Sequence, residues 1–146
     1  MINHYSSILI MRIDEMSRSE LTDLGFGEFG VDEVEHTTFT LPDGVRLALR
    51  IWSPAGSITH VSKNIVPGSS ADDDQTFPAV LEYLPYRKAD WTAERDHRRH
   101  PWLASHGYVV VRADMRGSGD SDGVYYDEYL AQENEDACKL IGKEHC

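Results

Sequence analysis

Residues 108–123 read YVVVRADMRGSGDSDG, and this stretch decides the fold. The three valines from Val109 to Val111 form an apolar run of the kind found in strands that are buried in a parallel sheet. The run leads into a glycine-rich loop, in which Gly117 and Gly119 permit a tight backbone path. A buried strand that opens into such a loop is typical of an α/β protein.

An antiparallel hairpin is predicted upstream of this strand. Apolar and polar residues alternate over residues 38–41 and again over 45–52, which is the pattern of two half-buried strands. The turn between them is Pro-Asp-Gly at 42–44, where proline presets φ and Gly44 tolerates positive φ. Residues 1–32 lack sustained periodicity, so we expect a loose N-terminal arm there.

A parallel crossover is predicted between the hairpin and the loop. Residues 78–84 read PAVLEYL, a short apolar strand suited to the centre of a sheet. Pro101 is expected at the first position of the helical turns that end before Gly107 at C′. Strand, helix and strand in this order imply a right-handed crossover. A second helix is predicted over 128–141.

These elements predict one partial α/β domain over residues 33–146, in which an antiparallel hairpin is followed by a parallel strand-helix-strand unit and the sheet is incomplete. The chain length of 146 residues suits a single core. The polar segment 56–76 is expected to be a solvated loop insertion. Its three consecutive aspartates lack the alternating spacing of a calcium loop.

The composition excludes several classes of partner. There are 25 acidic and 14 basic residues, and the formal net charge of -11 argues against nucleic acid and anionic membranes. No apolar run approaches the roughly 20 residues that a membrane span needs, so we expect a cytoplasmic protein. Cys138 and Cys146 are expected to be free thiols.

Four short motifs carry a resemblance to a known family. They are PDGVRL at 42–47, LPYRK at 84–88, HGYVVVR at 106–112 and DMRGSGDSDG at 114–123. Together they resemble the X-Pro dipeptidyl-peptidase and cocaine-esterase group of α/β-hydrolases, over a stretch from about residue 34 to about residue 141. The resemblance implies that the chain is the N-terminal part of an α/β-hydrolase fold.

The resemblance also implies a function. Members are serine hydrolases that cleave an ester or X-Pro amide bond through an acyl-enzyme, with a small-molecule ester or a peptide as substrate and no cofactor or metal. Tyr86 matches the tyrosine whose hydroxyl contributes to the oxyanion hole of this family, where it would stabilise developing negative charge. The nucleophile and the rest of the triad are expected beyond this chain. The alternative is a complete, non-catalytic binding protein derived from the same fold; the oligomeric state stays open.

The loop itself contains a formal Gly-x-Ser-x-Gly match centred on Ser121, followed by Asp127, Asp136 and His145. A nucleophile elbow needs its serine at a sharp turn from strand to helix, whereas Ser121 lies several residues past the strand end. We therefore expect Ser121 not to be catalytic. Asp114 and Arg116 of the same loop are interpreted as structural, because an acid and a base can pin the loop by hydrogen bonds. A match to a phosphate-binding loop is excluded by the absence of its lysine.

Asp96, His97 and His100 are candidate metal ligands, because their spacing would bring them together on a helix. The sequence His-Arg-Arg-His places two cations beside such a site and supplies no glutamate of a His-Glu-x-x-His motif. A solvated polar face is the preferred interpretation.

Overall fold

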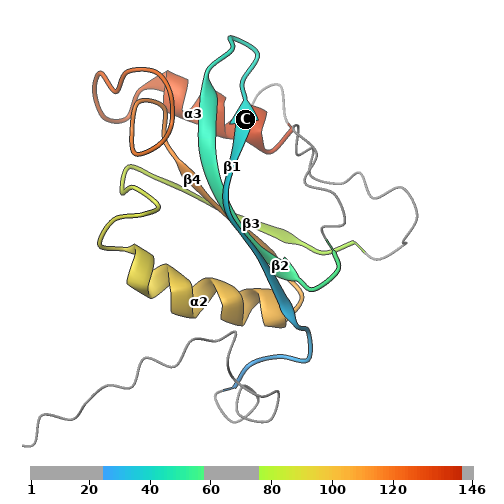
Figure 1. Ribbon diagram of the computed structural model, residues 1–146. Helices are drawn as coiled ribbons and strands as arrows, with labels where there is room; N and C mark the ends of the chain where they lie inside the picture. Colours follow the sequence, from blue (N-terminus) through green and yellow to red (C-terminus); the bar gives the residue numbers. More distant parts are fainter. Residues whose placement is uncertain (1–24, 58–75, 143–146) are drawn as a thin grey trace, which may run out of the picture.

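The computed structural model describes residues 25–57 and 76–142. Its elements are β1 (Val31–Thr40), β2 (Arg46–Pro54), β3 (Ala79–Leu84), α2 (Ala93–Ser105), β4 (Val109–Asp114) and α3 (Ala131–Leu140). The strands form one four-stranded sheet in the order β1-β2-β4-β3 (Figure 1). The fold is therefore mixed α/β with a small open sheet, as predicted.

The predicted hairpin is confirmed in β1 and β2, which pair antiparallel. In its turn, Gly44 N–H donates to the carbonyl of Leu41 at 2.9 Å, and the φ of Gly44 is +88°. β1 begins at Val31, so its first two residues belong to the segment that the sequence assigned to the arm. The arm residues 1–24 lie outside the described part of the chain, as does most of the predicted insertion at 56–76.

The crossover from β3 through α2 to β4 is also confirmed, and β3 and β4 pair in parallel. The prediction for the start of the helix is wrong, because α2 begins at Ala93 and Pro101 lies inside it. The first two turns of α2 are rich in charged residues, and no apolar periodicity marks them in the sequence. Gly107 does occupy C′, with φ at +87° and its N–H bonded to the carbonyl of Ala104 at 3.0 Å.

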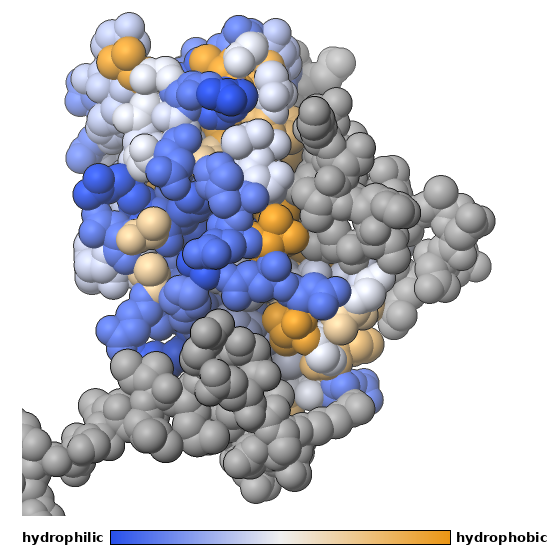
Figure 2. Space-filling model, in the orientation of Figure 1, coloured by the Kyte–Doolittle hydropathy of each residue, from blue (hydrophilic) through white to orange (hydrophobic). Residues whose placement is uncertain are grey.

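The two helices cover opposite faces of the sheet. Alternate residues of β2 point to opposite faces: Ile51 packs with Leu140 of α3, and Trp52 packs with Ala104 of α2. The cluster on the α3 face is apolar, with Leu49, Ile51 and Ala113 at its centre. The outer surface in the view of Figure 2 is mostly hydrophilic, with separate small hydrophobic areas.

β3 lies at the edge of the sheet, and among the described residues no strand pairs with its outer side. The apolar sequence of residues 78–84 suggested the centre of a sheet, whereas β3 pairs only with β4 among the described residues. β3 is apolar apart from Glu82, and a free apolar edge strand is a template for pairing with another strand.

Two further predictions differ from the structure. α3 begins at Ala131 and is shorter than the predicted 128–141, because Tyr129 just before it has a φ of +62°, outside the helical region. Cys138 is disulfide-bonded, so the expectation of a free thiol there is wrong, and Cys146 lies outside the described residues. A sequence separation between two thiols does not decide their redox state.

Neither helix of the described chain is long and apolar enough to cross a membrane.

The loop after β4 is held by backbone hydrogen bonds within itself. Gly117 N–H donates to the carbonyl of Asp122 at 2.9 Å, and Ser121 N–H donates to that of Ser118 at 3.0 Å. Gly117 and Gly119 have φ values of +71° and +56°. The predicted need for glycine at both positions is therefore confirmed.

We predict that Gly117→Ala destabilises the fold far more than Gly44→Ala. Both glycines have positive φ, but a Cβ at Gly117 would overlap the backbone of Val124 and Tyr125, whereas no atom of the described residues lies within 4 Å of a Cβ at Gly44. Gly44→Ala should lower the unfolding free energy by about 1 kcal/mol, and Gly117→Ala by about 3 kcal/mol or more. Urea unfolding of the two variants measures the difference. Equal losses of unfolding free energy in the two variants would show that the loop can rearrange to accommodate a Cβ at position 117.

Candidate functional site

Tyr86 lies in the turn that follows β3, at the carboxyl ends of the two parallel strands. In open α/β sheets, ligands bind at this end of the strands. The Tyr86 side chain is 51% exposed, and its ring meets that of Trp91 edge-on, with the centroids 5.9 Å apart. Tyr86 is therefore a half-exposed residue at the end of the sheet where ligands bind in this fold class.

The backbone of this turn is fixed by β4 and by the loop that follows it. Ser118 Oγ donates to the carbonyl of Pro85 at 3.3 Å. The Arg112 guanidinium donates to the carbonyl of Tyr86 itself. Lys88 N–H donates to Asp114 Oδ1 at 2.5 Å. Three successive parts of the turn are thus attached to one neighbouring strand and loop.

Asp114 connects the turn to the glycine-rich loop. Its side chain is buried, and its second oxygen accepts a hydrogen bond from Asp120 N–H at 3.0 Å. Lys88 Nζ pairs with Asp120 in addition, and that hydrogen bond holds the pKa of Asp120 below its ordinary value. A Cβ at Gly119 would overlap Asp114 Oδ2. The structural role predicted for Asp114 is confirmed.

Ser121 is occupied by structural hydrogen bonds. Its hydroxyl donates to the carbonyl of Asp114 and accepts from Ala48 N–H, both at 2.8 Å, so it joins β2 to the end of β4. Asp136, one of the acids that follow it in the sequence, is bound instead to Arg116. His145 lies outside the described residues. Within the described residues, Ser121 is therefore part of the structural hydrogen-bond network of the loop.

Arg116 ties the loop to α3 and to the hairpin turn. Its guanidinium makes two hydrogen bonds to the Asp136 carboxylate, at 2.7 and 2.8 Å, and pairs with Asp43 at 2.8 Å. The bonds to Asp136 raise the pKa of Arg116, and Arg116 in turn lowers the pKa of Asp43. Such two-bonded pairs are geometrically specific. The structural role predicted for Arg116 is confirmed.

A pocket of about 210 Å³ lies between the Tyr86 turn and the loop. Its lining residues come from these two segments: Arg87, Ala89, Asp90, Asp114, Gly119 and Asp120. The charged groups around it are paired, because Arg87 Nη2 lies 2.6 Å from Asp90 Oδ2 and Asp120 is paired with Lys88. Tyr86 itself does not line the pocket, but its sequence neighbour Arg87 does.

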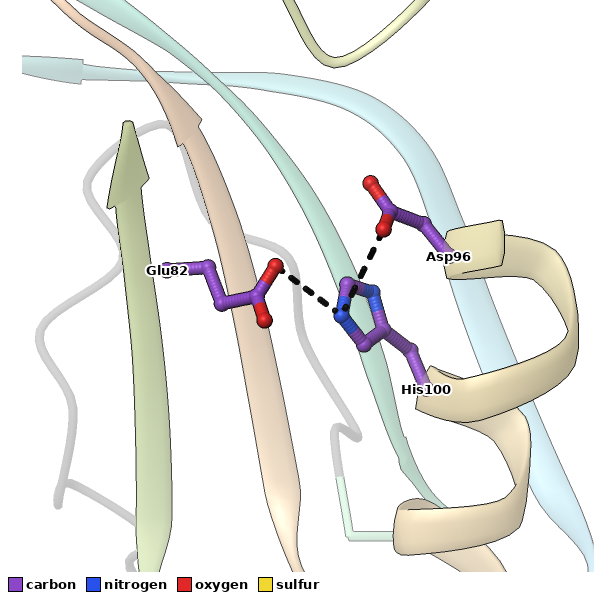
Figure 3. A group of neighbouring side chains, drawn as sticks. All are labelled: Glu82, Asp96 and His100. Atoms are coloured by element: carbon purple, nitrogen blue, oxygen red, sulfur yellow. Dashed lines mark ion pairs between the residues drawn. The ribbon is translucent and has the colours of Figure 1, made fainter. Parts of the chain in front are cut away.

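A second group of chemistry-bearing side chains lies under α2. Figure 3 shows Glu82 of β3 and Asp96 of α2 both facing His100 of α2. His100 Nε2 is 3.3 Å from Glu82 Oε2 and 4.0 Å from Asp96 Oδ1. Asp96 and His100 are buried, so the prediction of a solvated polar face is wrong for both, while His97 is exposed as predicted. They are buried because their spacing of four places them on the face of α2 that packs on the sheet.

One ligand atom from each of these three residues lies within 4.8 Å of the others, a separation that a shared metal ion would require. The carboxylates of the group are already paired with guanidinium groups. Arg95 lies 2.6 Å and Arg112 3.3 Å from Asp96, and Arg99 pairs with Glu82. Three fixed cations would repel a divalent ion at this distance. The arrangement fits a buried network of ion pairs and does not fit a metal.

His100 is neutral within this network. Burial, above all, and then the cations of Arg99, Arg95 and Arg112 lower its pKa to about 4, although Asp96 acts in the opposite direction. Among the described residues neither ring nitrogen has a hydrogen-bond partner, and the ring packs against that of Trp52 with the centroids 4.6 Å apart. Sequence reasoning missed this network. The spacing of Asp96, His100 and Ala104 at intervals of four was the signal that could have revealed it.

Residues 43–142 match the model of the family described as X-Pro dipeptidyl-peptidase (S15 family). The match covers more than half of the 146 residues and includes both the Tyr86 turn and the glycine-rich loop. No curated protein matches the chain.

Similar solved structures include two of a CocE/NonD family hydrolase from Staphylococcus aureus. One gives a TM-score of 0.51 at 20% identity, covering 75% of this chain and 19% of that chain. The other gives a TM-score of 0.54 at 16% identity, covering 94% and 26%. An α-amino acid ester hydrolase gives 0.45 at 19% identity, covering 81% and 20%. The Staphylococcus aureus structures support the fold, and this chain spans only 19% to 26% of their length.

We predict that the chain loses stability as the pH falls below 6.5. The unfolded chain binds a proton at His100 near pH 6.5, whereas the folded chain binds it only near pH 4, so acid favours the unfolded state. The loss at pH 5 should be about 2 kcal/mol. Urea unfolding between pH 7 and pH 5 measures it, above the range in which the carboxylates become protonated.

Two variants separate His100 from other groups. His100→Asn should flatten the dependence on pH, whatever its own stability, because the titrating group is gone. His97→Asn, which changes the exposed histidine of the same helix, should retain the slope. A slope that survives in His100→Asn would contradict the assignment.

Proposed function

The chain belongs to the X-Pro dipeptidyl-peptidase (S15) family, and from this membership we propose that it is the N-terminal part of a serine hydrolase. The longer enzyme would cleave an ester or X-Pro amide bond through an acyl-enzyme. The family implies a small substrate. The proposal is supported by the fraction of the related structures that the chain spans, 19% to 26%, and by the open edge of β3.

The observation that carries the catalytic part of the proposal is the placement of Tyr86. Its side chain is half exposed at the carboxyl end of β3, its carbonyl is bound by Arg112, and the rest of its turn is held by Asp114 and Ser118. A preorganised hydroxyl donor at a position where negative charge develops lowers the barrier of acyl transfer. In this proposal Tyr86 supplies one donor of the oxyanion hole. A strand on the outer side of β3 brings the nucleophile and the second donor.

A non-catalytic binding protein is the second candidate, and exposed aromatic side chains favour it. Trp91, Tyr126 and Tyr129 are 76%, 82% and 92% exposed. Aromatic side chains of this kind are enriched at protein interfaces. In the hydrolase proposal, the same residues would contact the remainder of the enzyme or its substrate.

We predict that the purified 146-residue chain hydrolyses neither a p-nitrophenyl ester nor a Gly-Pro anilide. The described residues hold Ser121 in structural hydrogen bonds and offer it no oriented base. Release of p-nitrophenol or of the aniline is the measurement. Turnover that disappears in Ser121→Ala but persists in Ser118→Ala would overturn the prediction.

We further predict that a longer product of the same gene contains a strand and a Gly-x-Ser-x-Gly elbow after α3. In that protein, Tyr86→Phe should lower kcat by about 10² to 10³ with little change in KM, because it removes a donor that acts in the transition state. Tyr108→Phe, at an exposed tyrosine that precedes β4 at the opposite end of the strand from the Tyr86 turn, is the matched control. The transcript sequence beyond Cys146 tests the first point.

An in-frame stop confirmed directly after Cys146, together with a stable monodisperse product, would contradict the hydrolase proposal and favour the binding protein. If the elbow is found but Tyr86→Phe retains full kcat, the hydrolase proposal is supported and the oxyanion-hole role of Tyr86 is rejected.

A further inference from the structure

Arg112 of β4 makes the contact with the peptide that carries the catalytic candidate. Its side chain is fully buried, and its guanidinium donates to the carbonyl of Tyr86. It also donates to the carbonyl of Ala113 at 3.3 Å and to that of Glu82 at 3.5 Å. One guanidinium group therefore donates hydrogen bonds to three carbonyls, which lie on β4, on β3 and in the turn after β3.

The guanidinium is held in place from the opposite side by α2. Arg112 Nε lies 3.3 Å from Asp96 Oδ2. Asp96 is in turn bound through its other oxygen by Arg95, at 2.6 Å. A buried cation without an anion would be strongly unfavourable, so Asp96 permits the charge of Arg112 at this depth. The network under α2 thus ends at the backbone of Tyr86.

Arginine suits this position better than lysine. A guanidinium is planar and directs five N–H donors in fixed directions, whereas an ammonium group is a flexible point charge. The carbonyl that Arg112 binds is directly attached to the Cα of Tyr86. Fixing that carbonyl restricts the rotation of the peptide and hence the direction in which the Tyr86 side chain leaves the backbone.

We propose that Arg112 is a positioning residue for Tyr86, and that Asp96 holds Arg112 in the orientation this requires. The catalytic consequence rests on the proposed function, but the positioning itself concerns only the described chain. In this proposal the role of the buried charges under α2 is to orient the turn after β3, and not to bind a metal.

Arg50 provides a matched control. It lies directly opposite Arg112 in the pairing of β2 with β4, so both side chains project from the same face of the sheet. It is almost buried and is paired with a carboxylate, Glu33 Oε1, at 2.5 Å. Among the described residues it contacts Glu33 and the ring of Trp52, and neither lies in the Tyr86 turn. Arg50→Lys therefore perturbs a similar ion pair without touching Tyr86.

The test measures backbone order in the 146-residue chain by ¹⁵N relaxation. The amide of Arg87 is the probe, because it shares a peptide plane with the Tyr86 carbonyl. Its order parameter should be near 0.85 in the parent and fall below about 0.6 in Arg112→Lys. Asp96→Asn should lower it in the same direction, and Arg50→Lys should leave it unchanged. Urea unfolding of each variant shows whether general destabilisation accounts for the change.

An unchanged order parameter in both Arg112→Lys and Asp96→Asn would overturn the proposal, as would an equal fall in Arg50→Lys. If Arg112→Lys does not fold, Asp96→Asn against Arg50→Lys decides the question. In the longer enzyme, Arg112→Lys should lower kcat about tenfold or more with KM nearly constant, and should add little to Tyr86→Phe. A fall in order without a fall in kcat would leave the positioning intact and reject the oxyanion role of Tyr86.

Discussion

The hydrogen bonds accepted by the buried carboxylate of Asp114 hold together the segments around the candidate site. The carboxylate stands at the end of β4 and accepts hydrogen bonds from Lys88 N–H on one side and Asp120 N–H on the other. The carbonyl of the same residue accepts from Ser121. One residue therefore positions both segments that rim the candidate site. A buried carboxylate left without these donors would be strongly destabilising, so the two segments are tied to each other by the same requirement.

The two faces of the sheet bury side chains of different chemistry. The face under α3 is apolar, and there the hydrophobic effect favours packing without directional demands. The face under α2 carries Arg112, Asp96, Glu82 and His100, which have to be paired or neutral to be buried. Such a network is weak evidence for stability, since its desolvation offsets its attraction. Its value here is geometric, because the pairs fix where the Arg112 guanidinium points.

The chain belongs to the S15 family, and the outer edge of β3 is unpaired among the described residues. β3 carries the candidate residue at its end and leaves its outer hydrogen-bonding groups available to a further strand. The turn with Tyr86 is fixed from the β4 side, where α2 and the loop contact it. The described part of the chain therefore holds the Tyr86 turn in place from the β4 side alone.

Local chemistry in the sequence was sufficient to predict the hairpin, the crossover, the glycine-rich loop and the structural roles of Asp114 and Arg116. These features depend on short-range rules: alternation, turn residues, and glycine where φ is positive. Tyr86 was identified by resemblance, and its exposure is consistent with that choice. What only the tertiary structure decided is the burial of Asp96 and His100, the course of α2 through Pro101, and the contact of Arg112 with Tyr86. Charged residues look solvated in a sequence, because their partners come from a helix and strands far apart along the chain. Only packing α2 onto β3 and β4 brings those partners together.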